Sequence, residues 1–291
     1  MRRCTMLMLC PECGKPVDLG AACCAGGHTF ETVDGVVSLF SAERRDELDP
    51  YLRDFEQWRE DRGDLLNDPS VYPRLPEAPP GGDVGMWKLR KLDLALIRRL
   101  LQGRSRQRVL EIGGWNGWLS HQLSEDGHDV VAIDYFVHPF DGLRARKHFP
   151  EAGWRAVQMD LEDLTILQGP FDVIIFNHGL GTFIDPVQKV RDATALLASG
   201  GMMIATGLTV FKDTSRIEAH FKAVRCEFEE ATGRDLFFKP MKGYLDSRNL
   251  RDLRDVGLVI RREPRLWRPN LRALLDPSRP RFMYGVLRRD H

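Results

Sequence analysis

Apolar residues from Met86 onward recur at two spacings, one typical of helices and one typical of buried strands. Residues 89–101 place leucine and isoleucine at helical intervals, whereas short unbroken apolar runs predict strands covered on both faces. The predicted strands are 109–112, 130–134, 154–158, 171–176 and 202–206. The further predicted helices are 118–123, 141–148 and 186–197. Strands that alternate with helices favour a parallel sheet with right-handed crossovers.

The order of elements changes after residue 206. The pattern at 247–256 predicts a helix, and the patterns at 258–262 and 282–287 predict strands. Only a proline-rich loop is expected between these two strands. Two successive strands with no helix between them favour an antiparallel hairpin that closes the sheet. The segment 207–246, between the fifth strand and this tail, is interpreted as an inserted lid.

The part of the chain before residue 86 divides in two. Residues 1–40 are rich in cysteine and glycine, and residues 41–85 are charged and then rich in proline and glycine. The first half of the second stretch is compatible with a helix, but the prolines that follow remove amide donors and disfavour helical backbone. We therefore predict a small module at 1–40, a partly helical linker at 41–85 and a main domain at 86–291.

A glycine-rich turn follows the first predicted strand and reads E-I-G-G-W-N-G from Glu111 to Gly117. Glycines allow the backbone to turn tightly and to approach a ligand closely. Asp134 ends the second strand, 21 residues after Gly113, where a carboxylate can accept hydrogen bonds from both hydroxyls of a ribose. Trp118 stands where a dinucleotide motif has its third glycine, so the pattern indicates a nucleoside site and disfavours NAD.

This segment resembles motif I of class I S-adenosylmethionine-dependent methyltransferases, usually written (D/E)-x-G-x-G-x-G. Trp115 takes the place of the middle glycine. Further motifs of the family follow in its usual order, at 171–177, Asp185-Pro186 and 196–201. The resemblance implies an α/β fold with a Rossmann-like seven-stranded sheet, mostly parallel with an antiparallel closing hairpin. It also implies S-adenosylmethionine as the co-substrate.

The resemblance assigns cofactor-binding roles to individual residues. It implies that Glu111 orients the loop near the methionine amino group, that Asp134 binds the ribose and that Asp160 contacts the adenine amine. The full predicted set is Glu111, Gly113, Gly114, Gly117, Asp134, Asp160 and Asn177. Each acid also has a structural alternative, since an aspartate at a strand end often caps a helix and Glu111 can be a buried acid bonded to backbone amides.

Five of the six cysteines lie between residues 4 and 24. We expect a cytoplasmic protein, and there such clustering favours a metal over disulfides. The spacing Cys10-x-x-Cys13 and Cys24-x-x-x-His28 supplies four tetrahedral ligands for zinc, with Cys23 as the alternative to Cys24 and unligated thiols as the alternative to the site. The stretch resembles the zinc ribbon that precedes some ribosomal RNA guanine methyltransferases. A module this small needs the metal to fold, so the zinc is expected to be structural.

Methyl transfer from a sulfonium is an in-line displacement in which the enzyme mainly aligns the reactants. In the family, the end of the fourth strand faces the methyl group, and here it carries Asn177-His178. Histidine titrates near neutrality, so His178 is the candidate base for an oxygen or nitrogen nucleophile. The alternative is a histidine bonded within a loop. The N/D-P-P-Y/F signature is absent, which disfavours methylation of exocyclic amines in DNA.

The chain has 42 acidic and 42 basic residues, so its net charge favours neither nucleic acid nor membrane as a partner. No apolar run approaches the ~18 residues that span a bilayer. We expect a small or medium-sized organic acceptor beneath the lid. The aromatic residues of the lid are Phe211, Phe221, Phe228, Phe237, Phe238 and Tyr244. RNA base methylation with help from the ribbon, and cofactor binding without catalysis, are the alternatives, and the oligomeric state is left open.

Overall fold

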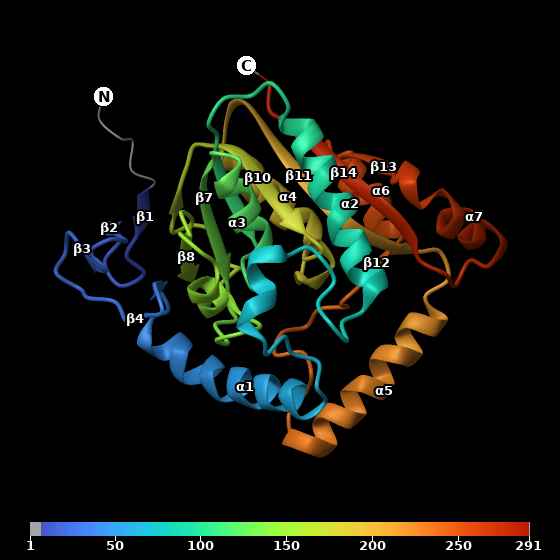
Figure 1. Cartoon of the computed structure of the whole chain (residues 1–291), viewed down its shortest axis with the longest axis horizontal. Helices are drawn as coiled ribbons and strands as arrows, with labels where there is room; N and C mark the ends of the chain where they lie inside the picture. The colour runs from blue at the N-terminus through green and yellow to red at the C-terminus, as the bar shows by residue number, and fades with distance from the viewer. Residues whose placement is uncertain (1–6, 291) are drawn as a thin grey trace.

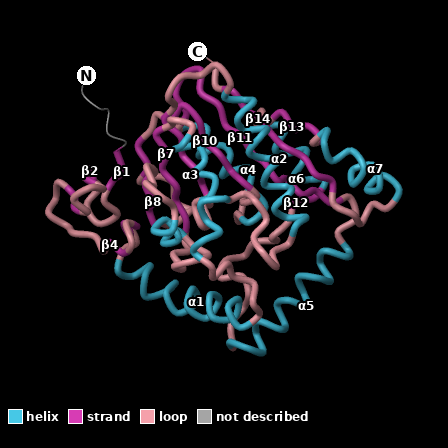
Figure 2. Tube along the Cα trace, in the orientation of Figure 1, coloured by secondary structure: helices cyan, strands magenta, loops and turns pink. Residues whose placement is uncertain are grey.

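The computed structural model describes residues 7–290, and a large, mostly parallel β-sheet lies at its centre (Figures 1 and 2). Its parallel strands are β6 Arg108–Ile112, β7 Asp129–Asp134, β8 Arg155–Gln158, β10 Phe171–Asn177 and β11 Leu197–Phe211. The antiparallel strands β13 Val259–Arg262 and β14 Arg281–Arg288 close one edge. The spatial order of these seven is β13-β14-β11-β10-β6-β7-β8. The predicted fold class and its closing hairpin are confirmed.

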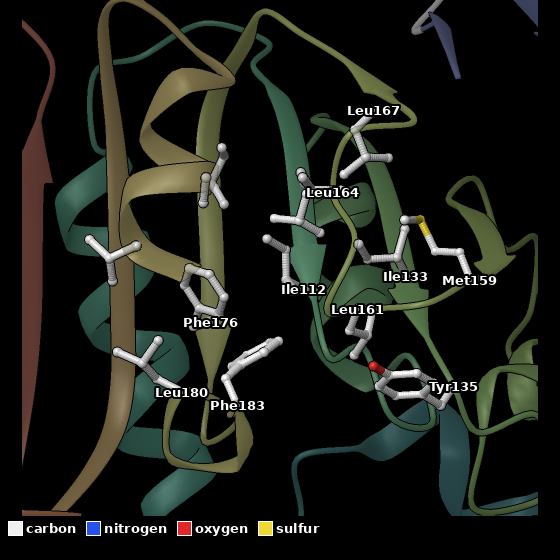
Figure 3. Close-up of a cluster of buried hydrophobic side chains, with 14 of the residues drawn as sticks. Ile112, Ile133, Tyr135, Met159, Leu161, Leu164, Leu167, Phe176, Leu180 and Phe183 are labelled. Atoms are coloured by element: carbon white, nitrogen blue, oxygen red, sulfur yellow. The ribbon is translucent and has the colours of Figure 1, made fainter. Parts of the chain in front are cut away.

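Alternate side chains of the strands enter two hydrophobic clusters, one on each face of the sheet. The helices α2 Val84–Leu101 and α3 Trp118–Glu125 contribute to one cluster, and α4 Pro186–Ala195 and α6 Ser247–Asp255 to the other. In β10, Ile175 faces the first cluster and Phe176 the second. Figure 3 shows part of the second cluster, where Phe176 lies beside Phe183. Burial on both faces explains why the strands read as unbroken apolar runs.

The N-terminal residues extend the main sheet instead of forming a detached unit. β5 Val36–Ser38 pairs in parallel with β8, and β4 Thr32–Val33 pairs with β5. A second, four-stranded sheet contains β1 Leu7–Leu9, β2 Pro16–Asp18, β3 Cys23–Cys24 and β9 Leu167–Gln168. Because β9 belongs to the main domain, the cysteine-rich module is joined to that domain at both its first and its last strand.

The linker and the insertion both contribute a long helix below the carboxyl ends of the parallel strands. These helices are α1 Ala42–Asp61 and α5 Ser215–Thr232, and Figure 1 shows them converging there. Phe228 of α5 packs against Tyr51, Phe55 and Trp58 of α1, with ring centroids 5.3–6.1 Å apart. The linker helix therefore covers the same edge of the sheet as the insertion.

Several predicted elements differ from the structure. Residues 143–148 form a 3-10 helix, η2 Leu143–His148, and β11 already begins at Leu197, so Gly200 and Gly201 lie inside a strand. The loop expected after β13 contains α7 Trp267–Leu275. Pro269 lies in the first turn of this helix. Backbone amides of the first turn have no partner within the helix, so proline is tolerated there. Among residues 7–290, no helix has the length and apolarity needed to cross a membrane.

Candidate active site

A cavity of about 1050 Å³ lies at the carboxyl ends of β6, β7 and β10. Its walls come from the glycine turn, from α1 and α2, from the linker loops at 63–68 and 79–83, and from residues 236–241. Open α/β sheets bind ligands at this edge of the sheet. The volume slightly exceeds the roughly 300–1000 Å³ typical of ligand sites, which leaves space for an acceptor beside a nucleoside cofactor.

The glycines of the turn act in different ways. Gly113 lines the cavity at φ +80°, a left-handed conformation that favours glycine, and nothing lies within 4 Å of the position of a Cβ. Gly117 does not line the cavity, but a Cβ there would lie 2.2 Å from the Trp154 ring. Gly114 lines the cavity, and a Cβ atom at this position would lie 2.8 Å from the Cβ atom of Ala132. The turn therefore needs glycine at these positions for conformation or for packing.

Asp134 joins the glycine turn to the end of β7. Its carboxylate accepts hydrogen bonds from the backbone amides of Trp115 at 2.7 Å and Phe136 at 3.1 Å. Burial raises the pKa of Asp134, and these amide hydrogen bonds counteract part of the rise. The residue lines the cavity, where its carboxylate can receive the hydroxyls of a ribose.

Replacing Asp134 with alanine should weaken binding of S-adenosylhomocysteine by roughly 1.5–3 kcal/mol, the range for losing a hydrogen bond to a charged group. Calorimetric titration measures the change. Asp129→Ala, at the other end of β7, is the matched control and should bind as the wild type does. An unchanged affinity in the Asp134→Ala protein would contradict the assignment.

Glu111 is the most deeply buried acid of the site, with 1% of its surface exposed. The hydroxyl of Ser120 donates to its Oε2 at 2.5 Å. Burial raises the pKa of Glu111 to about 8, so the carboxyl group holds its proton at neutral pH when no cation is near. The ammonium group of a bound methionine moiety would favour the ionised form.

Asp160 is placed outside the cavity wall, unlike the other predicted acids. Its carboxylate accepts hydrogen bonds from the Tyr135 hydroxyl at 2.6 Å, the Glu162 amide at 2.8 Å and Arg44 Nε at 2.9 Å. These contacts tie α1 to the loop after β8. The cavity wall beside it is made by Leu161 and Tyr135, which the sequence analysis did not single out.

Asn177 and His178 line the cavity at the end of β10. Thr206 Oγ1 donates to the side-chain oxygen of Asn177 at 3.0 Å. His178 Nε2 lies 2.7 Å from Oδ2 of Asp93, a buried residue of α2. Asp93 was not among the residues predicted from the sequence. Its position in the sequence could have indicated it. Asp93 stands one helical turn before Ile97, so its carboxylate lies on the apolar face of the predicted helix.

Arg90, also on α2, is a second functional candidate that the sequence analysis missed. Its guanidinium lies 4.6 Å from the Trp115 ring centre and 5.1 Å from that of Trp87. Among residues 7–290 no group accepts a hydrogen bond from its buried Nε, and burial lowers the pKa of Arg90 to about 10. Arg90 also has no ion-pair partner within the described part of the chain, and such a cation beside the glycine turn suits the carboxylate of a methionine moiety.

The four predicted metal ligands meet at one point of the N-terminal module. The ligand atoms of Cys10, Cys13, Cys24 and His28 all lie within 4.8 Å of one another. Cys23 is outside this group. Burial raises the pKa of the Cys24 thiol, but amide hydrogen bonds from the backbone of His28 and Gly26 outweigh it and bring the pKa to about 6. The arrangement therefore favours a thiolate at Cys24.

Residues 86–251 match the model of a protein family described as a methyltransferase domain, and this match spans more than half of the chain. The chain belongs to this family. It therefore contains an S-adenosylmethionine-dependent methyltransferase domain, and the predicted family and methyl donor are confirmed. The cavity described above, where the glycine turn, Glu111 and Asp134 meet, is therefore the candidate donor site.

The chain is 31% identical over 122 residues to a ubiquinone biosynthesis O-methyltransferase of Actinobacillus pleuropneumoniae. The match covers 40% of this chain and 51% of that protein, so the chain spans about half the length of this curated relative. A relative this partial leaves the acceptor unassigned.

Solved structures of similar fold are also methyltransferases by name. A putative methyltransferase of Bacillus halodurans is 15% identical, with a TM-score of 0.47 and coverage of 68% of this chain and 99% of that one. A putative sarcosine dimethylglycine methyltransferase of Galdieria sulphuraria is 12% identical, with a TM-score of 0.49 and coverage of 82% and 98%. Identities this low carry no information on the acceptor.

Proposed function

We propose that this methyltransferase transfers the methyl group of S-adenosylmethionine to a hydroxyl of a small or medium-sized organic acceptor. The pair formed by His178 and Asp93 carries the proposal, because His178 lines the cavity at the end of β10 and its Nε2 contacts Asp93 of α2. An imidazole that donates its Nε2 proton to Asp93 keeps Nδ1 free to accept a proton. His178 would take the hydroxyl proton as the oxygen–methyl bond forms and the sulfonium departs as a neutral thioether.

The walls of the cavity support an organic acceptor that can be enclosed. Aromatic side chains of α1 and of the segment 236–241 face it, and α5 contributes Phe221. Apolar walls with few convergent polar groups are typical of sites for organic molecules. Cover from two sides also excludes water from the reacting groups. An RNA hairpin would need a more open approach, so we favour the smaller acceptor.

His178→Ala should lower the rate of methyl transfer by about 10²–10⁴, the usual contribution of a positioned acid or base. Asp93→Asn should also lower the rate, because an amide no longer fixes the tautomer in which Nδ1 of His178 accepts a proton. The assay follows labelled methyl transfer from S-adenosylmethionine to a panel of hydroxylated aromatic and aliphatic compounds. His220→Ala, on the exposed side of α5, is the control.

The results separate the alternatives. An unchanged rate for His178→Ala across the pH range would rule out the base. Methyl transfer to RNA and to none of the organic compounds would replace the proposed acceptor class. Binding of S-adenosylhomocysteine with no transfer to either kind of acceptor would favour a non-catalytic role.

We also propose that the cysteine cluster holds one structural zinc ion. In a tetrahedral site with Zn–S bonds of about 2.3 Å and Zn–N bonds of about 2.0–2.1 Å, sulfur–sulfur and sulfur–nitrogen separations are about 3.8 and 3.6 Å. Here Cys13 Sγ and Cys24 Sγ are 3.7 Å apart, and His28 Nδ1 is 3.5 Å from the sulfurs of Cys10 and Cys24. Four protein ligands leave no open position, which supports a structural role over a catalytic one.

A further inference from the structure

Helix α7 lies at the edge of the molecule (Figure 1). Its outer face exposes large apolar side chains. Trp267, Leu271, Leu274 and Leu275 are 59, 50, 51 and 84% exposed. These four residues, called here the α7 face, account for four of the eight exposed large apolar residues among residues 7–290. A cluster of this kind on a folded surface indicates a contact site.

The orientation of α7 is set by its opposite side. The side chain of Asn270 donates to the backbone oxygen of Phe282 at 3.1 Å, and the Phe282 amide donates back to Asn270 Oδ1 at 2.8 Å. Asn270 and Ala273 are buried against β14. With about 3.6 residues per helical turn, the leucines and Trp267 then lie together on the outward side. The apolar side chains of α7 are therefore exposed because Asn270 and Ala273 hold the other side of the helix against β14.

The surroundings of the α7 face are strongly basic. Residues 259–281 carry seven arginines and two acids, a net charge of +5 in a chain whose total is zero. The arginines are Arg261, Arg262, Arg265, Arg268, Arg272, Arg279 and Arg281. Within the described part of the chain, the first five of these form no salt bridge with an acid. The balanced total charge, from which no membrane partner was expected, conceals this local excess.

We propose that the α7 face docks on the surface of an anionic lipid bilayer. A short helix with tryptophan and leucine on one side and arginines beside them has the composition of helices that lie in the plane of a membrane interface. The apolar side chains would enter the boundary of the acyl chains while the arginines contact the phosphate headgroups. A second copy fits less well, because in a two-fold dimer this basic surface would face itself. The proposal is independent of the acceptor.

The test uses the full chain and sedimentation with vesicles. Vesicles of phosphatidylcholine mixed with phosphatidylglycerol should bind the wild type, and vesicles of phosphatidylcholine alone should bind it much more weakly. Trp267→Ala combined with Leu275→Ser should lower the partition coefficient by roughly tenfold or more. Arg268→Glu combined with Arg272→Glu should lower it similarly and remove its dependence on salt. All four side chains are exposed, so the fold should persist.

Matched controls come from the same chain. Ile184→Ser removes an apolar side chain that is 48% exposed elsewhere, and Arg106→Glu reverses an exposed charge away from α7. Both should bind vesicles as the wild type does, and every variant should still bind S-adenosylhomocysteine. Equal vesicle binding by the α7 variants and the wild type would overturn the proposal. So would a wild-type dimer, seen by light scattering, that the Trp267→Ala and Leu275→Ser changes dissociate.

Discussion

A chain carrying Cys24→Ser should be purified without zinc, whereas Cys23→Ser should retain about one zinc per chain. Cys24 belongs to the group of four converging ligand atoms, and the neighbouring Cys23 does not. A hydroxyl in place of the Cys24 thiolate removes a preferred soft ligand and leaves only three. Elemental analysis of protein purified without added metal measures the result. The choice of ligand would be wrong if Cys23→Ser lost the metal and Cys24→Ser kept it.

We expect loss of the zinc to have a large but local effect on folding. Zinc contributes about 10–16 kcal/mol to the folding of small zinc modules. Without it, β1, β2 and β3 should lose protection from hydrogen exchange, because the metal would supply much of the stability of so short a segment. The main sheet should persist with its own core, so S-adenosylhomocysteine should still bind. Exchange measured by mass spectrometry distinguishes this outcome from unfolding of the whole chain.

The free energy of unfolding of the ligand-free protein should fall as the pH rises from about 4.5 to about 8, in large part because of Glu111. The pKa of this carboxyl is about 8 in the folded protein and 4.5 when unperturbed. Between these values the unfolded chain releases the proton while the folded chain keeps it, so rising pH favours unfolding. The shift corresponds to roughly 5 kcal/mol once the pH exceeds the folded-state pKa.

Glu111→Gln should remove most of this fall in the free energy of unfolding with rising pH. Glutamine is neutral at every pH and can still accept the hydrogen bond from Ser120. Burial also raises the pKa of Asp141 to about 6 and of Glu56 to about 7, but both groups are present in wild type and variant. Urea unfolding at pH 5 and at pH 8.5, with the exposed Glu125→Gln as control, isolates Glu111. Parallel pH curves for wild type and Glu111→Gln would contradict the prediction.

The repeating strand and helix pattern was sufficient to predict the sheet, its parallel core and its closing hairpin. Strands buried on both faces consist of unbroken apolar runs, and tight turns require glycine. Both features can therefore be recognised from short stretches of sequence. The same holds for the glycine turn and for the four predicted metal ligands at 10–28, whose spacings are short. In these cases neighbouring residues determine the geometry directly.

Only the tertiary structure decided which distant residues meet. His178 and Asp93 are 85 residues apart, and Arg44 and Asp160 are 116 apart. Such pairs depend on which helix covers which face and on the direction of each side chain, and periodicity encodes neither. The pairing of β5 with β8 and the outward side of α7 likewise result from contacts between separate segments. A sequence pattern shows that a helix has an apolar side, but the packing of the whole chain decides whether that side is buried.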